Sequence, residues 1–103
     1  MLDRDMTTVV VDPRRSSVAV TGEVDASNAE NLCVAILAAA RSHGSPVEGD
    51  LAGVTFMDSA GVRAITDASL ALAASGAGLV LCNVPRNVQR ILKILEATLG
   101  VSR

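Results

Sequence analysis

The chain has 103 residues, of which half are hydrophobic and 19% are charged, and its formal net charge is −2. This length suits one domain with a core of its own, held together without a metal or a disulfide. Phe56 is the only aromatic residue and Arg14-Arg15 is the only adjacent basic pair. Composition and charge therefore exclude nucleic-acid binding by phosphate neutralisation or by base stacking.

Hydropathy predicts no membrane segment. Three of the first five residues are charged and no long apolar stretch follows them, so they do not form a secretory signal. The longest apolar region, around residues 70–84, is interrupted by Ser75, Gly76 and Gly78 and is too short to span a bilayer. We expect a soluble, cytoplasmic protein with one domain over residues 1–103, in which residues 1–6 form a flexible tail.

Cys33 and Cys82 lie in apolar runs, and His43 is the only histidine. This set has none of the ligand spacings of a metal site, so we predict neither a metal nor a cofactor. Both cysteines are expected to be small buried hydrophobic residues, since disulfides are rare in a reducing cytoplasm. A redox switch between them is the alternative.

The first half of the chain predicts a hairpin and a helix. Residues 7–11 and 17–21 are β-branched strands joined by a turn at residues 12–15, and residues 22–25 are expected to leave the sheet. Residues 27–30 (Ser-Asn-Ala-Glu) have the pattern of a capping box. The helix that follows should end near His43-Gly44. Its predicted buried stripe is Leu32, Cys33, Ile36, Leu37 and Ala40.

The second half alternates strands and helices. Residues 47–51 are a weak strand marred by two acids, and residues 54–57 lead into an Asp58-Ser59 turn. A helix is expected over residues 60–74, and residues 79–82 predict a strand buried on both faces. Pro85 should open a third helix. Its predicted buried stripe is Val88, Ile91, Leu92, Leu95 and Leu99.

The element order β-β-α-β-α-β-α predicts an α/β fold. We expect a mainly parallel sheet of four to five strands with an N-terminal hairpin, packed with three or more helices. The loops at the carboxyl ends of parallel strands carry the sites in such folds. Residues 25–28, 58–61 and 84–87 should therefore lie along one edge.

The Asp58-Ser59 turn has two readings. Both residues favour the N-cap position, where a side-chain oxygen accepts the free N–H groups of the first helical turn. An exposed serine hydroxyl at a helix start is also a suitable phosphate acceptor. Gly61 likewise has two possible roles: its missing side chain either lets a partner approach the backbone or satisfies a packing requirement.

Three segments carry a family resemblance. They are residues 22–25 (Gly-Glu-Val-Asp), 56–62 (Phe-Met-Asp-Ser-Ala-Gly-Val) and 79–84 (Leu-Val-Leu-Cys-Asn-Val), each before a predicted helix. In this order and context the chain resembles a STAS domain of the bacterial anti-sigma factor antagonist type, over nearly its whole length. Ala60 departs from the pattern, because many relatives have a second hydroxyl residue there.

The resemblance implies a binding protein and not an enzyme. Such a protein sequesters an anti-sigma factor with a serine kinase fold and so releases a sigma factor. The kinase phosphorylates the serine that corresponds to Ser59, and a phosphatase reverses this step. The partner-binding residues implied or expected are Asp25, Asn28, Asp58, Ala60, Gly61, Val62 and Arg63.

Alternatives remain for several of these assignments. Asp25 could be a magnesium contact or a helix-start anion, and Arg63 could be a solvated arginine. A STAS subunit of a lipid-transport ATPase or of a signalling scaffold, without control by phosphorylation, is the second function. A serine hydrolase is disfavoured, because Met57 stands where Gly-x-Ser-x-Gly needs its first glycine. The sequence leaves the oligomeric state open.

Overall fold

The structure is a computed structural model that describes residues 8–11 and 15–99. The elements follow the predicted order and are β1 (Thr8–Val11), β2 (Ser17–Val24), α1 (Ala29–His43), β3 (Val47–Met57), α2 (Ser59–Ala74), β4 (Leu79–Cys82) and α3 (Arg86–Leu99). Three predictions fall outside the described residues and side chains: the tail, residues 12–14 of the turn, and the contacts of Leu95 and Leu99.

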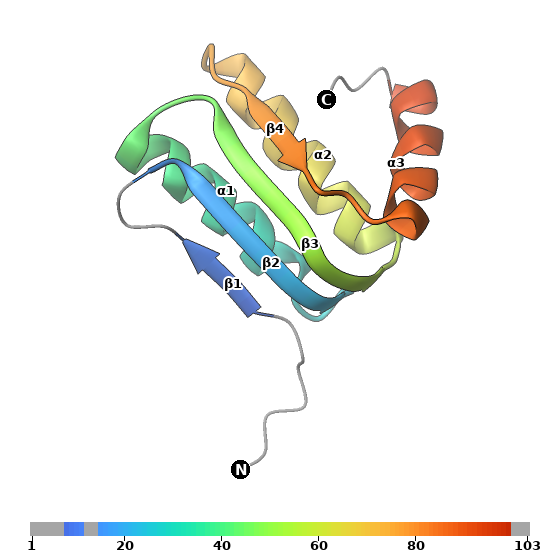
Figure 1. The fold of residues 1–103 in the computed structure, drawn as a ribbon. Coiled ribbons are helices and arrows are strands. Elements are labelled where there is room, and N and C mark those ends of the chain that lie inside the picture. The colour runs from blue at the N-terminus through green and yellow to red at the C-terminus, as the bar shows by residue number, and fades with distance from the viewer. Residues whose placement is uncertain (1–7, 12–14, 100–103) are drawn as a thin grey trace.

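The four described strands form one sheet in the order β1-β2-β3-β4. β1 pairs antiparallel with β2, and β2, β3 and β4 run parallel, as predicted for a hairpin followed by strand–helix units. Helices α1 and α2 lie side by side behind the sheet, and α3 stands beyond β4 (Figure 1). The carboxyl ends of the parallel strands consequently share one edge of the sheet.

The core lies between one face of the sheet and the two covering helices. It is built from aliphatic side chains that are almost fully buried, including Val18, Val20 and Leu51 from the strands and Leu32 and Ile36 from α1. Full burial of such a side chain contributes about 1.5–3 kcal/mol. The other face of the sheet is not covered by α1 or α2 (Figure 1).

The prediction that residues 22–25 leave the sheet is wrong for the first three of them. β2 runs on to Val24, and Gly22, Glu23 and Val24 pair with Val54, Phe56 and Met57 of β3. The pairing register shifts between Gly22 and Glu23, and Gly22 has φ +90°. Glycine adopts this backbone conformation without steric cost, so the strand bends here and does not end.

β3 is one continuous strand and not two fragments. Glu48 and Asp50, which weakened its prediction, are partly exposed and alternate with buried Val47, Gly49 and Leu51. Glu48 also forms an ion pair of 2.7 Å with Arg15. An acid therefore fits this central strand, because helices cover only one face of the sheet.

The expectation that β4 is buried on both faces is wrong. Leu79 is buried, but Val80 is 45% exposed. β4 lies at the edge of the described sheet, and Val80 follows Leu79, so its side chain points to the opposite face. The apolar run had suggested a central strand, whereas it belongs to a short edge strand.

The helix ends agree with the sequence. α1 ends at His43, and Gly44 follows with φ +87° while its N–H donates to Ala40 O. Pro85 stands directly before α3 and its carbonyl accepts from Val88 N and Gln89 N. Of the predicted α1 stripe, Leu32 and Ile36 are buried, and Cys33, Leu37 and Ala40 are partly buried against the core.

Cys33 and Cys82 are free thiols of intermediate burial. Burial raises the pKa of the Cys33 thiol, and the carboxylates of Asp67 and Glu30 raise it further. Burial is also the main cause of the raised pKa of Cys82. Both thiols are thus kept protonated at neutral pH, in the form that reacts slowly.

Two features are absent from the described part of the chain. No helix among residues 15–99 has both the length and the apolar character needed to cross a membrane. The same part of the chain contains no group of three or more His, Cys, Asp and Glu residues placed to hold a metal ion.

Candidate functional site

Two hydrogen bonds connect the loops at the carboxyl edge of the sheet. Asp58 N donates to Val24 O at 3.1 Å, which joins the β3–α2 turn to the end of β2. Asn87 Nδ2, in the first turn of α3, donates to Thr55 O of β3 at 3.4 Å. The three predicted loops are therefore held at the same edge.

The β2–α1 loop is organised by the side chains of Asp25 and Asn28. One carboxylate oxygen of Asp25, Oδ1, accepts from Ser27 N at 2.9 Å and from Ser27 Oγ at 2.6 Å. Asn28 Oδ1 accepts from Asp25 N, and Asn28 Nδ2 donates to Glu23 O, both at 3.0 Å. These bonds tie the loop to itself and to the end of β2.

The capping box predicted at residues 27–30 is wrong. The hydroxyl of Ser27 bonds to Asp25, and α1 begins at Ala29 after Asn28, whose side chain makes no capping bond. Asn28 is only 5% exposed. It supports the loop from beneath, and a protein docked on this edge would scarcely touch it.

Asp58 is the N-cap of α2. Its Oδ1 accepts from Ala60 N at 2.9 Å and from Gly61 N at 3.2 Å. Asp58 is thus the residue that caps the helix, and Ser59 is not needed for this role. Ser59 is the first residue of the helix and is exposed, as a phosphate acceptor must be.

Gly61 meets a packing requirement. A Cβ atom at this position would lie 2.6 Å from Met57 Cγ and 2.8 Å from Val24 Cγ1. The missing side chain lets the start of α2 approach the ends of β2 and β3. Val62 is fully buried. Both residues lie below the surface and hold the turn in place, and the expectation that they contact a partner stays a prediction.

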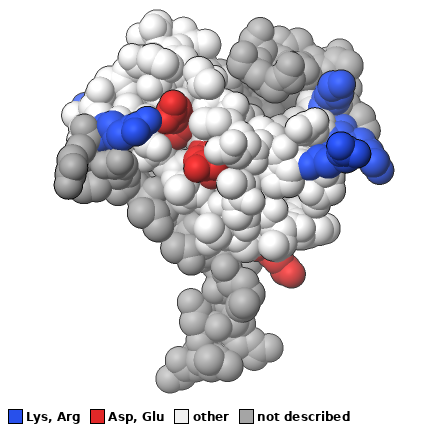
Figure 2. All heavy atoms as spheres, in the orientation of Figure 1, with Lys and Arg blue, Asp and Glu red and all other residues white. Residues whose placement is uncertain are grey.

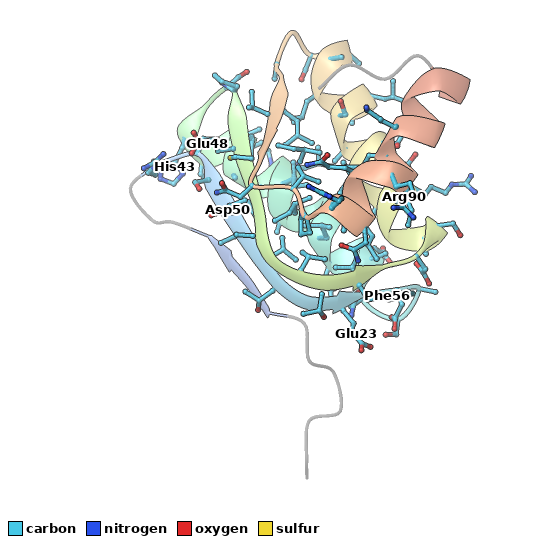
Figure 3. All side chains as sticks on the ribbon, turned by 45° about the vertical axis from the view of Figure 1, so that its right-hand side comes forward. Glu23, His43, Glu48, Asp50, Phe56 and Arg90 are labelled. Carbon is cyan, nitrogen blue, oxygen red and sulfur yellow. The ribbon has the colours of Figure 1, made fainter. Side chains whose placement is uncertain are left out.

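The accessible part of the edge is smaller than the predicted set. Ser59 and Arg63 are exposed, whereas Asp25, Asp58 and Ala60 are of intermediate burial. Phe56, which the sequence reading used only as part of the family motif, is 48% exposed. Glu23 and Phe56 lie close together at the end of the sheet (Figure 3). The edge thus presents an aromatic ring beside the carboxylate of Glu23.

The comparisons with known proteins give the family. A family model described as "Mlab, STAS domain" matches residues 7–98. The chain belongs to the STAS domain family. This confirms the resemblance drawn from the three motif segments.

Solved structures show the same fold for this STAS domain. It is similar to the anti-sigma factor antagonist SpoIIAA in its unphosphorylated form, with 20% identity and a TM-score of 0.65 over 85% of this chain and 82% of that one. It is also similar to an anti-sigma factor antagonist from Mycobacterium paratuberculosis, with 24% identity and a TM-score of 0.62 over 95% of this chain and 86% of that one. No curated protein matches the chain.

Proposed function

We propose that this STAS domain is an anti-sigma factor antagonist. It binds an anti-sigma factor of the serine kinase type through the edge around Ser59 and so releases a sigma factor in the bacterial cytoplasm. Phosphorylation of Ser59 by that kinase ends the binding, and a phosphatase restores it. The observation that carries the proposal is the turn itself, in which Asp58 caps α2 and leaves the hydroxyl of Ser59 exposed.

The turn can accept a phosphate without losing its fold. A phosphoserine adds about −1.5 to −2 charges and three acceptor oxygens. At the first residue of α2 this charge meets the positive end of the helix dipole, a favourable term of about 0.3–1 kcal/mol when exposed. The hydroxyl is at the surface, so the added group displaces no core side chain.

A docked partner responds differently to the same phosphate. The new charge would be forced beside the carboxylate of Asp58 and, from the neighbouring loop, that of Asp25. Closing a protein surface over these groups removes the water that screens their repulsion. A loss of about 3 kcal/mol at the interface lowers affinity by about a hundredfold. Phosphorylation therefore acts on the complex and leaves the free protein folded.

The partner-binding residues of this proposal are the accessible ones. They are Asp25, Asp58, Ala60 and Arg63, which are exposed or partly exposed, whereas the buried Asn28, Gly61 and Val62 hold these loops in position. In this proposal the domain is a ligand and a substrate of its partners and not an enzyme.

One observation favours a second candidate. The matching family model is described as "Mlab, STAS domain" and not as an antagonist. In this alternative the chain is a STAS subunit of a transporter ATPase or a signalling scaffold, and Ser59 is not phosphorylated. The same edge would then form a permanent contact.

A comparison of binding partners separates the two candidates. We expect the purified domain to bind the kinase-fold anti-sigma factor encoded nearest to it, measured by calorimetry, and Ser59→Ala to bind with similar affinity because only a hydroxyl is removed. Stable binding to a transporter ATPase, together with no heat of binding to the kinase-fold protein, would establish the second candidate.

A further inference from the structure

The outer edge of β4 offers free backbone groups. Within the described sheet β4 pairs only with β3. Val47 N donates to Gly78 O at 2.9 Å, and the bonding residues alternate along a parallel strand. Gly78 and Val80 therefore face β3, whereas Leu79 and Leu81 turn their N–H and C=O groups toward the outer edge.

A groove lies between this edge and α3. Its volume is about 380 Å³, near the lower end of the range for ligand sites. Leu81, Val84 and Leu92 give it an apolar lining, and Asn83, Gln89 and Lys93 contribute polar groups. A strand placed beside β4 would point alternate side chains to this side of the sheet, so one apolar side chain can enter the groove.

The exposed face of the first two turns of α3, residues 86–93, is positively charged. Arg86, Arg90 and Lys93 are exposed and share one stripe of the helix, because they are three, four and seven residues apart. Residues 86–93 contain no acid. Lys and Arg side chains gather on the side of the molecule where α3 lies (Figure 2), and Arg90 points outward from the helix (Figure 3).

We propose that β4 and α3 together bind an extended, acidic segment of a partner protein. The segment adds as a strand to β4, places an apolar side chain in the groove and directs carboxylates to Lys93 and Arg90. This site adjoins the Ser59 edge at Val84 and Arg86 but contains none of the residues proposed to bind a partner there, and it does not depend on the function proposed for Ser59. It would allow a second protein to bind the domain whatever the phosphorylation state.

Charge and backbone geometry select this occupant. The free N–H and C=O groups of Leu79 and Leu81 require an extended chain, since a helix has few backbone groups to offer. The positively charged stripe of α3 favours acidic side chains in the bound segment. A second copy fits poorly, because a twofold pairing of β4 with β4 would bring each Lys93 and Arg90 toward their own counterparts.

Selection from a library of short random peptides tests the proposal without knowledge of the partner. We expect the full-length protein to enrich peptides that alternate apolar residues with Asp or Glu. The best peptide should shift the backbone amide resonances of Leu79, Leu81 and Lys93 in NMR spectra. Methylation of the peptide nitrogens that face β4 should abolish binding, because the peptide then loses its donors.

Charge reversal provides the matched comparison. Lys93→Glu and Arg90→Glu should each weaken the peptide by about tenfold or more, whereas Arg41→Glu, an exposed arginine at the end of α1, should leave it unchanged. The proposal is overturned if no acidic peptide is enriched, or if Lys93→Glu or backbone methylation has no effect. A dimer formed through β4 that the peptides do not dissociate would overturn it as well.

Discussion

Replacement of Ser59 by Asp is expected to lower the affinity for the anti-sigma factor by about a hundredfold. The new carboxylate stands beside Asp58 at the start of α2, where a docked protein would exclude the water that screens their repulsion. A penalty of about 3 kcal/mol corresponds to this loss. Titration calorimetry with the kinase-fold partner measures it directly.

Two controls keep this result interpretable. Ser59→Ala removes the hydroxyl without adding charge and should bind much as the wild type does. Ser59→Asp should also keep its stability to within about 0.5 kcal/mol, since Ser59 is exposed and the side chain meets no core atom. An Asp variant that is stable and still binds as tightly as the wild type would contradict the electrostatic switch.

Replacement of Gly61 by Ala is expected to destabilise the fold by about 1–3 kcal/mol. The added Cβ would lie 2.6 Å from Met57 Cγ and 2.8 Å from Val24 Cγ1, and Val24 is a stiff, fully buried side chain. The helix cannot move away without opening the contact between α2 and the sheet. Urea denaturation with an unchanged slope would measure the loss.

The sign of the Gly61 result is informative because helix propensity predicts the opposite. In an open helical position, Gly→Ala stabilises a protein by about 1 kcal/mol. Ala60→Gly, one residue earlier in the same turn, is the matched control and should cost about this propensity term together with the contact of its partly buried methyl group. If Gly61→Ala raises stability, the close packing of α2 on Val24 and Met57 is wrong.

The order of elements, the helix ends and the family could be predicted because their signals are local. Gly44 and Pro85 mark helix boundaries by their own backbone preferences, and the structure places both next to helix ends. The buried stripe of α1 follows from helical periodicity alone. The Asp-Ser turn could be placed between a strand and a helix for the same reason.

What the sequence could not show depends on contacts between distant segments. The capping box at residues 27–30 fits local rules, but the hydroxyl of Ser27 bonds to Asp25 once Asn28 ties that loop to β2. Likewise, only the positions of Met57 and Val24 reveal that Gly61 serves packing. Local preference suggested a cap for Ser27 and left two roles open for Gly61, and contacts with distant residues decide both cases.

The exposure of Phe56 was missed for a related reason. Strict alternation from buried Val54 would turn Phe56 toward the core, yet the next buried residue is Met57. The register of β2 against β3 shifts at Gly22, and Phe56 then faces outward opposite Glu23. One step in β2, from Gly22 to Glu23, accompanies two steps in β3, from Val54 to Phe56, so β3 itself carries an extra residue that turns Phe56 to the surface.

The most direct test of Ser59 as a switch combines phosphorylation with binding. The domain is incubated with the kinase-fold anti-sigma factor and ATP, the modified residue is identified by mass spectrometry, and the affinity of the phosphorylated protein is measured. We expect one phosphate, on Ser59, a loss of affinity of about a hundredfold or more, and an unchanged circular dichroism spectrum. Phosphate that persists in Ser59→Ala, or a phosphorylated protein that binds like the unmodified one, would contradict the proposed switch.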